Sequence, residues 1–197
     1  MDEPNFTFRN GPCDFYSGTK ALAEEIIQTI GDGYIWRIAE PFDERDDSRN
    51  ILSKLHSPHK IQDNLYSLSH LNEAVCACLD LWERRSPFGI YNVTNPGAIT
   101  SREIVKMVQR ILKPPITFEF CNDDADLCCG AAKLLRSYSV MDSSKLLSCG
   151  IKMRSVHEAL EHTLSLWQSV NQIRDLRHEL LRAAVCESVS TKIKLIK

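Results

Sequence analysis

FYSGTKALAEEII, residues 15–27, is the stretch from which the fold of this chain can be read. Its apolar residues recur at the spacing of an α-helix, which predicts a helix over 16–30. The expected apolar stripe of this helix consists of Leu22, Ala23, Ile26, Ile27 and Ile30. Gly31 and Gly33 are expected to end it. A short apolar run over 34–38 then predicts a buried strand that stops before Pro41.

The rest of the chain continues to alternate between helix and strand patterns. We expect, in order, a charged loop over 43–50, a helical turn over 51–55, a weak strand over 65–68, a helix over 70–85 and strands over 89–94 and 116–120. The expected apolar face of the 70–85 helix consists of Leu71, Val75, Cys78, Leu79 and Trp82. Two capping boxes, Thr100 with Glu103 and Ser155 with Glu158, predict the starts of two more helices. Strands that alternate with helices indicate an α/β fold.

Composition and charge narrow the class of protein. A chain of 197 residues with 43% apolar and 25% charged residues is typical of one globular domain with a real core. The formal net charge of -2 gives no reason to expect nucleic acid or an anionic membrane as partner. The acidic, polar start and the absence of a long apolar run favour a cytoplasmic protein. The eight cysteines have no zinc-site spacing, so we expect free thiols and no metal.

Tyr16 and Lys20 are the candidate catalytic pair. They are four residues apart and therefore share one face of the expected helix. A phenol ordinarily ionises near about 10, and an ammonium group beside it favours the phenolate. Such a pair can move a proton on or off a hydroxyl group. The alternative from spacing alone is a surface helix that carries a packed tyrosine.

Further stretches match one family in the same order. They are Trp36–Pro41, Arg49–Ile51, Tyr91–Gly97, Arg136 followed by Met141–Leu146, and Ser155–Leu160. Together with the opening run, they resemble the extended short-chain dehydrogenase/reductases of the NAD-dependent epimerase/dehydratase type. Within that family the chain looks most like the dTDP-4-dehydrorhamnose reductases and the plant-type UDP-rhamnose reductase/epimerases. The resemblance covers roughly residues 4 to 167.

The resemblance implies an α/β fold made of the C-terminal half of a Rossmann-like NAD(P)-binding fold plus a small substrate-binding lobe. Residues 1–167 would form this unit, and 168–197 a charged, helical tail. It also implies that Tyr16 is the acid/base and that Lys20 assists it and binds the nicotinamide ribose, so both would contact NAD or NADP. Arg136 would hold the substrate diphosphate, and Asn50 would contact the nucleotide sugar.

Other interpretations of these polar residues stay open. Arg136 is alternatively a solvated loop charge, and the role of Asn50 is undecided from the sequence. Arg37, inside a buried run, is expected to form a structural ion pair rather than to touch substrate, and Glu40 is either its partner or a residue that faces the cleft. The His56-x-x-His59 spacing is interpreted as loop polarity rather than as a metal site.

The chain departs from the family in one respect. It contains no G-x-G-x-x-G or related glycine run before Tyr16, and such a turn seats the pyrophosphate of a dinucleotide. We therefore weigh a fragment, one half of a split protein with a complementing N-terminal partner, and a degenerate homologue.

Two functions follow. The first is an NAD(P)-dependent nucleotide-sugar reductase, epimerase or dehydratase of the rhamnose type, inactive as this chain alone. The second is a non-catalytic nucleotide-sugar-binding or regulatory module. The oligomeric state stays open: a homodimer is one alternative, because the family that the chain resembles often dimerises through the Tyr-x-x-x-Lys helix and its neighbour, and a complementing N-terminal partner is the other.

Overall fold

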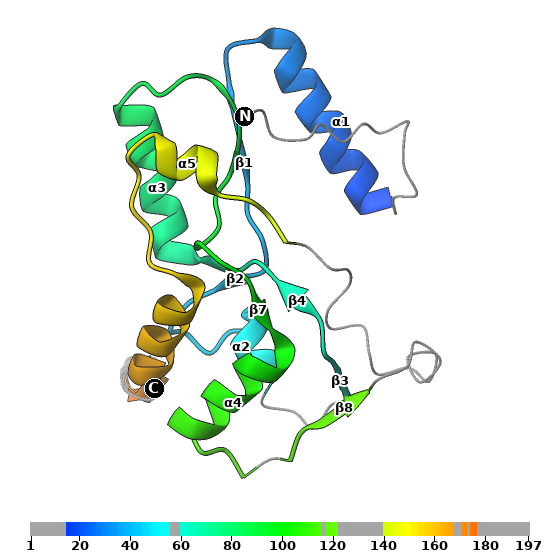
Figure 1. Cartoon of the computed structure of the whole chain (residues 1–197), viewed down its shortest axis with the longest axis vertical. Coiled ribbons are helices and arrows are strands. Elements are labelled where there is room, and N and C mark those ends of the chain that lie inside the picture. The colour runs from blue at the N-terminus through cyan, green and yellow to red at the C-terminus, as the bar shows by residue number, and fades with distance from the viewer. Residues whose placement is uncertain are drawn as a thin grey trace, which may run out of the picture.

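The computed structural model describes residues 15–55, 60–115, 117–121, 140–167, 171–172 and 174–176. In chain order its elements are α1 (Phe15–Ile30), β1 (Tyr34–Arg37), β2 (Pro41–Phe42), α2 (Ile51–Lys54), β3 (Lys60–Gln62), β4 (Leu65–Tyr66), β5 (Ser69–His70), α3 (Leu71–Glu83), β6 (Gly89–Asn92), β7 (Ile99–Thr100), α4 (Ser101–Ile111), β8 (Glu119–Cys121) and α5 (Ser144–Ser148). A further helix runs over residues 156–167. Figure 1 shows α1 at one end of the molecule, whereas α4 and the 156–167 helix lie toward the other end.

The strand pairings confirm the predicted α/β fold. β1 runs parallel to β6, with Tyr34 opposite Gly89 and Arg37 opposite Asn92. β2 and β5 are also parallel, as are β3 and β8, whereas β4 and β7 are antiparallel. Because α3 lies in the connection between β1 and β6, the chain forms a strand–helix–strand unit with parallel strands.

The local signals for helix ends hold in the structure. α1 ends at Ile30, and Gly31 takes a left-handed φ of 87° while its amide donates to the Ile27 carbonyl at 3.2 Å. Thr100 and Glu103 form the expected reciprocal capping box at the start of α4. These contacts satisfy backbone groups that a helix cannot satisfy internally, so the predicted boundaries were reliable there.

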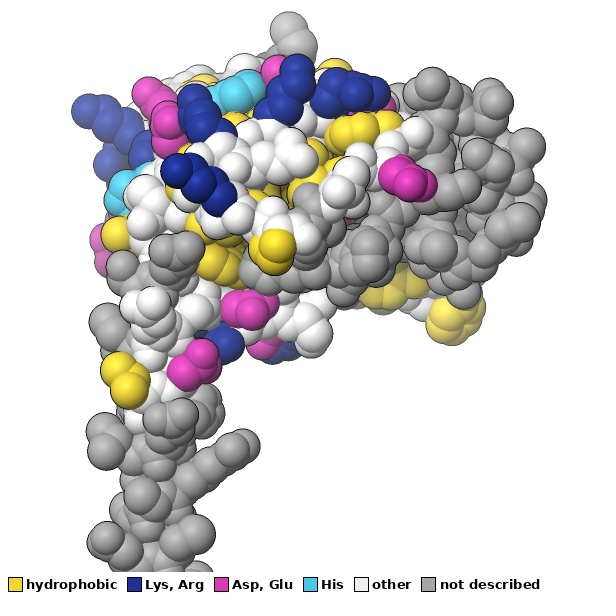
Figure 2. Space-filling model, turned by 90° about the horizontal axis from the view of Figure 1, so that it is seen from below, with side chains coloured by type: hydrophobic (Ala, Val, Ile, Leu, Met, Phe, Trp, Pro, Cys, Tyr) yellow, Lys and Arg dark blue, Asp and Glu magenta, His cyan; other side chains and the backbone are white. Residues whose placement is uncertain are grey.

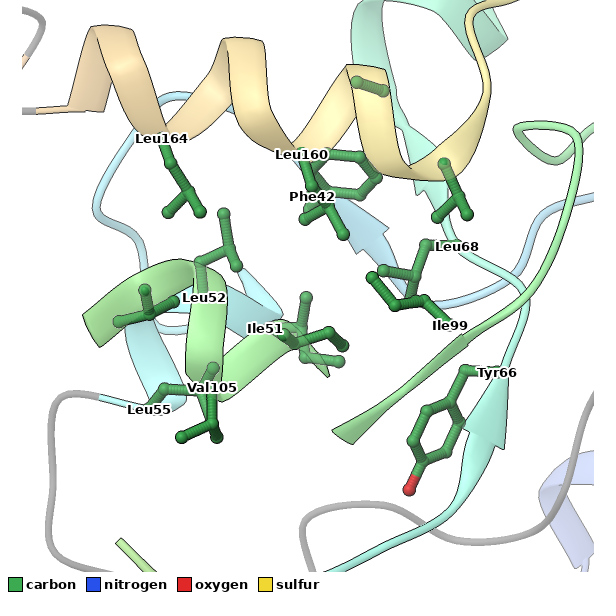
Figure 3. Packing of buried hydrophobic residues seen from close by; sticks show 14 of the residues in the cluster. Phe42, Ile51, Leu52, Leu55, Tyr66, Leu68, Ile99, Val105, Leu160 and Leu164 are labelled. Atoms are coloured by element: carbon green, nitrogen blue, oxygen red, sulfur yellow. The ribbon is translucent and has the colours of Figure 1, made fainter. Parts of the chain in front are cut away.

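One large cluster of buried apolar residues, the lobe core, fills the lower part of the molecule. It includes Phe42, Ile51, Leu52, Leu55, Ile61, Tyr66, Leu68, Ile99, Ile104, Val105, Val108, Phe118, Val156, Ala159, Leu160, Leu164 and Trp167. Figure 3 shows Leu160 and Leu164 extending from the 156–167 helix toward Phe42 and Leu52. The last well-formed helix thus packs on segments from the first third of the chain.

A second cluster, the sheet core, joins α3 to β6 and to residues 146–151. It consists of Ala74, Ala77, Cys78, Leu81, Tyr91, Val93, Leu146 and Ile151. The predicted apolar face of this helix was wrong in most positions, because Val75, Leu79 and Trp82 are 50%, 52% and 64% exposed. The buried residues of this helix are instead Ala74, Ala77, Cys78 and Leu81, which belong to the sheet core.

The predicted apolar stripe of α1 was wrong for the same reason. Gly18 and Ala21 are its buried residues, while Leu22, Ile26 and Ile30 are exposed. None of the helices that the structure describes is long and apolar enough to cross a membrane. The lower face in Figure 2 carries both basic and acidic side chains among neutral ones, in keeping with the near-zero net charge.

Candidate active site

Tyr16 and Lys20 lie together on the exposed part of α1. The Lys20 Nζ atom is 5.5 Å from the centre of the Tyr16 ring, and the Tyr16 side chain is 68% exposed. The Thr19 hydroxyl donates to the Tyr16 carbonyl at 2.7 Å within the first turns of the helix. The structure thus brings the predicted pair together and presents the phenol outward, where a reacting hydroxyl group can reach it.

An ion pair fixes α1 against the sheet. Arg37 on β1 donates to both carboxylate oxygens of Glu24, at 2.9 and 2.6 Å, and both side chains are mostly buried. Glu24 lies one helical turn after Lys20, so this fork also sets the orientation of the helix face that carries Tyr16 and Lys20. The expectation that Arg37 forms a structural ion pair is confirmed, and its partner is Glu24 rather than Glu40.

Asn50 begins α2 rather than facing an open space. Its side-chain oxygen accepts from the Leu52 amide at 3.0 Å, which makes it the N-cap of that helix. Its amide nitrogen donates to the carbonyl oxygens of Asp43 and Arg45, both at 2.8 Å. The side chain is buried and fully engaged inside the loop. Contact with a nucleotide sugar stays a prediction for this residue.

The segment of Asp142 and Lys145 is organised around β6. Asp142 accepts from the amide of Ser144 at 2.8 Å and from its hydroxyl at 2.9 Å, and these hydrogen bonds lower the pKa of the Asp142 carboxyl. Lys145 lies over the Tyr91 ring at 4.7 Å. Burial, followed by a hydrogen bond with Cys149, raises the pKa of Tyr91 to about 12. Tyr91 is therefore a neutral, buried structural phenol.

Three of the singled-out residues cannot be placed. Arg136, His56 and His59 lie outside the described residues. Within the part of the chain that the structure describes, no group of three or more His, Cys, Asp or Glu side chains is arranged to hold a metal ion. The thiols of Cys76, Cys78 and Cys149 are free, as expected.

The sequence did not predict the buried pair formed by His70 and Glu44. His70 Nδ1 accepts from the Glu73 amide at 3.4 Å and so caps α3, which leaves the ring hydrogen on Nε2 to meet Glu44 at 3.0 Å. The pair ties the start of α3 to the loop after β2. Glu44 and His70 are separated by 26 residues, and no spacing rule connects such distant positions.

A cavity of about 640 Å³ opens beside the same loop. Pro41, Phe42 and Leu71 provide apolar lining, and Arg45, Arg49 and Arg174 provide guanidinium groups. The charged run over 43–50 was the available sequence signal, but it was interpreted only as a loop. No sequence pattern predicted that Arg174 lines this cavity, because Arg174 is more than a hundred residues away from the loop in the chain.

Two proteins of Arabidopsis thaliana are similar to this chain. A bifunctional dTDP-4-dehydrorhamnose 3,5-epimerase/dTDP-4-dehydrorhamnose reductase is 29% identical over 163 residues, which covers 81% of this chain and 50% of that protein. A trifunctional UDP-glucose 4,6-dehydratase/UDP-4-keto-6-deoxy-D-glucose 3,5-epimerase/UDP-4-keto-L-rhamnose-reductase is 29% identical over 160 residues, covering 81% and 23%. The chain thus spans half or less of the length of these relatives. No family model matches it.

Solved structures show the same fold. A UDP-rhamnose synthase from Acanthamoeba polyphaga mimivirus superposes with a TM-score of 0.67 at 22% identity, over 84% of this chain and 61% of that one. A Thermus thermophilus UDP-glucose 4-epimerase, solved in complex with NAD, gives a TM-score of 0.59 at 15% identity, over 85% and 60%. The chain is therefore related in sequence and fold to the nucleotide-sugar epimerases and reductases of the extended short-chain dehydrogenase/reductase family.

Proposed function

We propose that this chain carries the acid/base helix and part of the substrate lobe of an NAD(P)-dependent nucleotide-sugar reductase, epimerase or dehydratase. The observation that carries the proposal is the placement of Tyr16 beside Lys20 on the exposed face of α1. The relatives named above, which are rhamnose-forming reductases and epimerases, support the reaction class. These relatives are longer than this chain, so the proposal concerns only the steps that this chain's own residues would perform.

Tyr16 would exchange a proton with a sugar hydroxyl or keto oxygen. The ammonium group of Lys20 stabilises the phenolate that forms when the proton leaves, because opposite charges favour the ionised form. The Arg37–Glu24 pair holds the helix, and hence both groups, at a fixed position relative to β1. Proton transfer needs this alignment within a hydrogen-bond distance of the substrate atom.

NAD or NADP would supply or accept the hydride at the sugar carbon. An exposed hydroxyl and an ammonium group one turn apart suit the ribose of a nicotinamide nucleotide, so Tyr16 and Lys20 are the residues that would hold it. No glycine-rich turn joins a strand to a helix among the described residues. The contacts proposed for the cofactor are therefore those of this pair.

The proposed substrate is a UDP- or dTDP-linked 4-keto-6-deoxy sugar. The names of the relatives give this substrate class, and Arg136 would hold its diphosphate through a guanidinium fork. Asn50 would act at the edge of the sugar site. Its engagement with the loop suggests that it shapes this edge by holding main-chain atoms.

Turnover of a UDP-4-keto-6-deoxy sugar with NADPH by the complete protein tests the proposal. We expect Tyr16→Phe to lower turnover by about 10²–10⁴-fold, because the phenol has no substitute as proton donor. Lys20→Met should also lower turnover. Lys106→Met, which removes an exposed lysine from α4, is the matched control and should leave turnover unchanged.

Unchanged turnover in Tyr16→Phe would overturn the assignment of the acid/base. If the wild-type protein binds UDP- and dTDP-sugars in isothermal titration but turns none of them over, the chain is instead a non-catalytic binding module. Absence of both binding and turnover would reject the nucleotide-sugar class altogether.

A further inference from the structure

The loop over 43–50 is held from two sides through its main chain. From the inner side, the Asn50 amide binds the carbonyl oxygens of Asp43 and Arg45. From the outer side, Asn171 and Arg174 bind main-chain groups of Glu44 and Asp46. The main chain of the loop thus depends on two different anchors, one local and one more than a hundred residues away in the chain, and both bind the peptide group between Arg45 and Asp46.

The outer anchor consists of Asn171 and Arg174. The Asn171 side-chain oxygen accepts from the Asp46 amide at 2.8 Å, and its nitrogen donates to the Glu44 carbonyl at 3.2 Å. The same nitrogen donates to the Trp167 carbonyl at 2.7 Å, which fixes Asn171 to the end of the 156–167 helix. Arg174 donates to the carbonyl oxygen of Asp46.

These contacts are separable from the packing of the molecule. Asn171 and Arg174 reach only main-chain atoms of the loop, and both side chains are half-buried. Of the described residues, the lobe core includes Trp167 but neither Asn171 nor Arg174. Each hydrogen bond of this kind contributes far less to stability than the packed core does. The segment can therefore detach without unfolding the lobe.

The anchored loop and its outer anchor also line the same cavity. Arg45, Asp47 and Arg49 from the loop and Arg174 and Asp175 from the C-terminal segment all border the space of about 640 Å³. Arg49 has only a 3.4 Å contact with Asp47, and its side chain is 91% exposed. Movement of the loop would change the width of the cavity and the position of its guanidinium groups together.

We propose that Asn171 and Arg174 form a strap that holds the 43–50 loop closed over this cavity, and that release of the strap opens the cavity while the lobe stays folded. Opening is a local event whose free energy is set by the strap contacts rather than by the core. The hydrogen bonds of Asn171 and Arg174 with the loop thus cross the boundary that was expected after residue 167. The inference does not depend on the proposed enzymatic function.

Amide hydrogen exchange on the full chain tests the strap. In an Asn171→Ala, Arg174→Met double variant we expect the Asp46 amide to exchange about tenfold faster than in the wild type, because its acceptor is gone. Trypsin cleavage after Arg45 should accelerate in parallel, as measured by mass spectrometry. Arg110→Met is the matched control, since it removes an exposed guanidinium that pairs with Glu161 elsewhere in the lobe, and it should change neither readout.

Two results would overturn the proposal. Equal exchange and cleavage rates in the double variant and the wild type would show that the strap does not hold the loop. Equal acceleration at Asp46 and at core amides such as those of Val105 and Leu160 would show that the segment is part of the cooperative core. Neither readout requires substrate or cofactor, so failure here is distinct from failure of the proposed function.

Discussion

The lobe core and the helices α1 and α3 of the layer that contains β1 and β6 differ in how many of their large apolar side chains are buried. In the lobe, Leu160, Leu164 and Ile99 are at most 1% exposed. In the layer, the residues buried by the helices are mainly small, and Leu79, Trp82 and Ile26 face outward. The lobe therefore has the larger apolar core, whereas the described part of the layer combines the smaller sheet core with specific polar contacts such as the Arg37–Glu24 pair.

The difference teaches how residue size relates to burial in this fold. Gly18, Ala21, Ala74 and Ala77 bury little area each, and hydrophobic stabilisation is roughly proportional to the area buried. Stability in the layer should consequently respond to ion pairs, and stability in the lobe to the volume of its side chains.

Truncation of one leucine in each region gives the largest expected contrast. Leu160→Ala should lower the free energy of unfolding by about 2–5 kcal/mol, because it leaves a cavity in a fully packed site. Leu79→Ala, at a half-exposed position of α3, should change it by less than about 0.5 kcal/mol. Urea unfolding followed by circular dichroism measures both. Similar losses in the two variants would remove the distinction between the regions.

Breaking the ion pair of the layer should have the next largest effect. Arg37→Met leaves the Glu24 carboxylate mostly buried without its fork, so we expect a loss of about 2 kcal/mol. A double-mutant cycle with Glu24→Gln isolates the pairwise free energy. A coupling free energy near zero would mean that α1 is held by its small buried residues alone.

The cap of α2 offers a smaller test at the edge of the lobe. Asn50→Ala removes an N-cap and three further polar contacts, and it should cost about 1–2 kcal/mol. Thermal unfolding is the readout. Asn50→Asp, which keeps the acceptor for the Leu52 amide but not the donor, is expected to recover part of the loss; no recovery would assign the effect to the donor contacts.

The smallest expected effect is on the stability of the protein at acidic pH. Hydrogen bonds from the Thr100 backbone amide and then from its hydroxyl lower the pKa of the Glu103 carboxyl below its ordinary value of 4.5. A depressed pKa in the folded state gives stabilisation that is present above pH 4.5 and is lost as the pH falls through the lowered value. Glu103→Gln should reduce this loss of stability at low pH, the acid limb of the stability curve, by about 1 kcal/mol or less. An unchanged limb in pH-dependent unfolding would exclude the capping carboxylate as its source.

Much of the fold was predictable because its signals are local. The ends of α1 and α4 follow from Gly31 and from the Thr100 capping box, each of which acts within a few residues. β2, β4, β5 and β7 have two residues each, too short to show any periodicity. The buried faces of α1 and α3 were not predictable from the largest apolar residues, because close helix–strand packing selects glycine and alanine instead.

The candidate site was predictable only where one helix contains all of it. Tyr16 and Lys20 meet because four residues make about one turn, and that spacing is visible in the sequence. Glu24 as the partner of Arg37 was missed because the chain reverses between them. Asn50 precedes a predicted helical turn, so its capping role had a signal that was not used. The His70–Glu44 pair had none.

The parallel pairing of β1 with β6 also governs the order in which the molecule can assemble while it is being synthesised. Tyr34 at the start of β1 binds the carbonyl oxygen of Ser86, 52 residues further along the chain. At about 5–20 residues per second, the ribosome needs roughly 3–10 s to supply that partner. For this interval β6 is missing, so the pairing of β1 with β6 can form only after α3 and β6 have been synthesised.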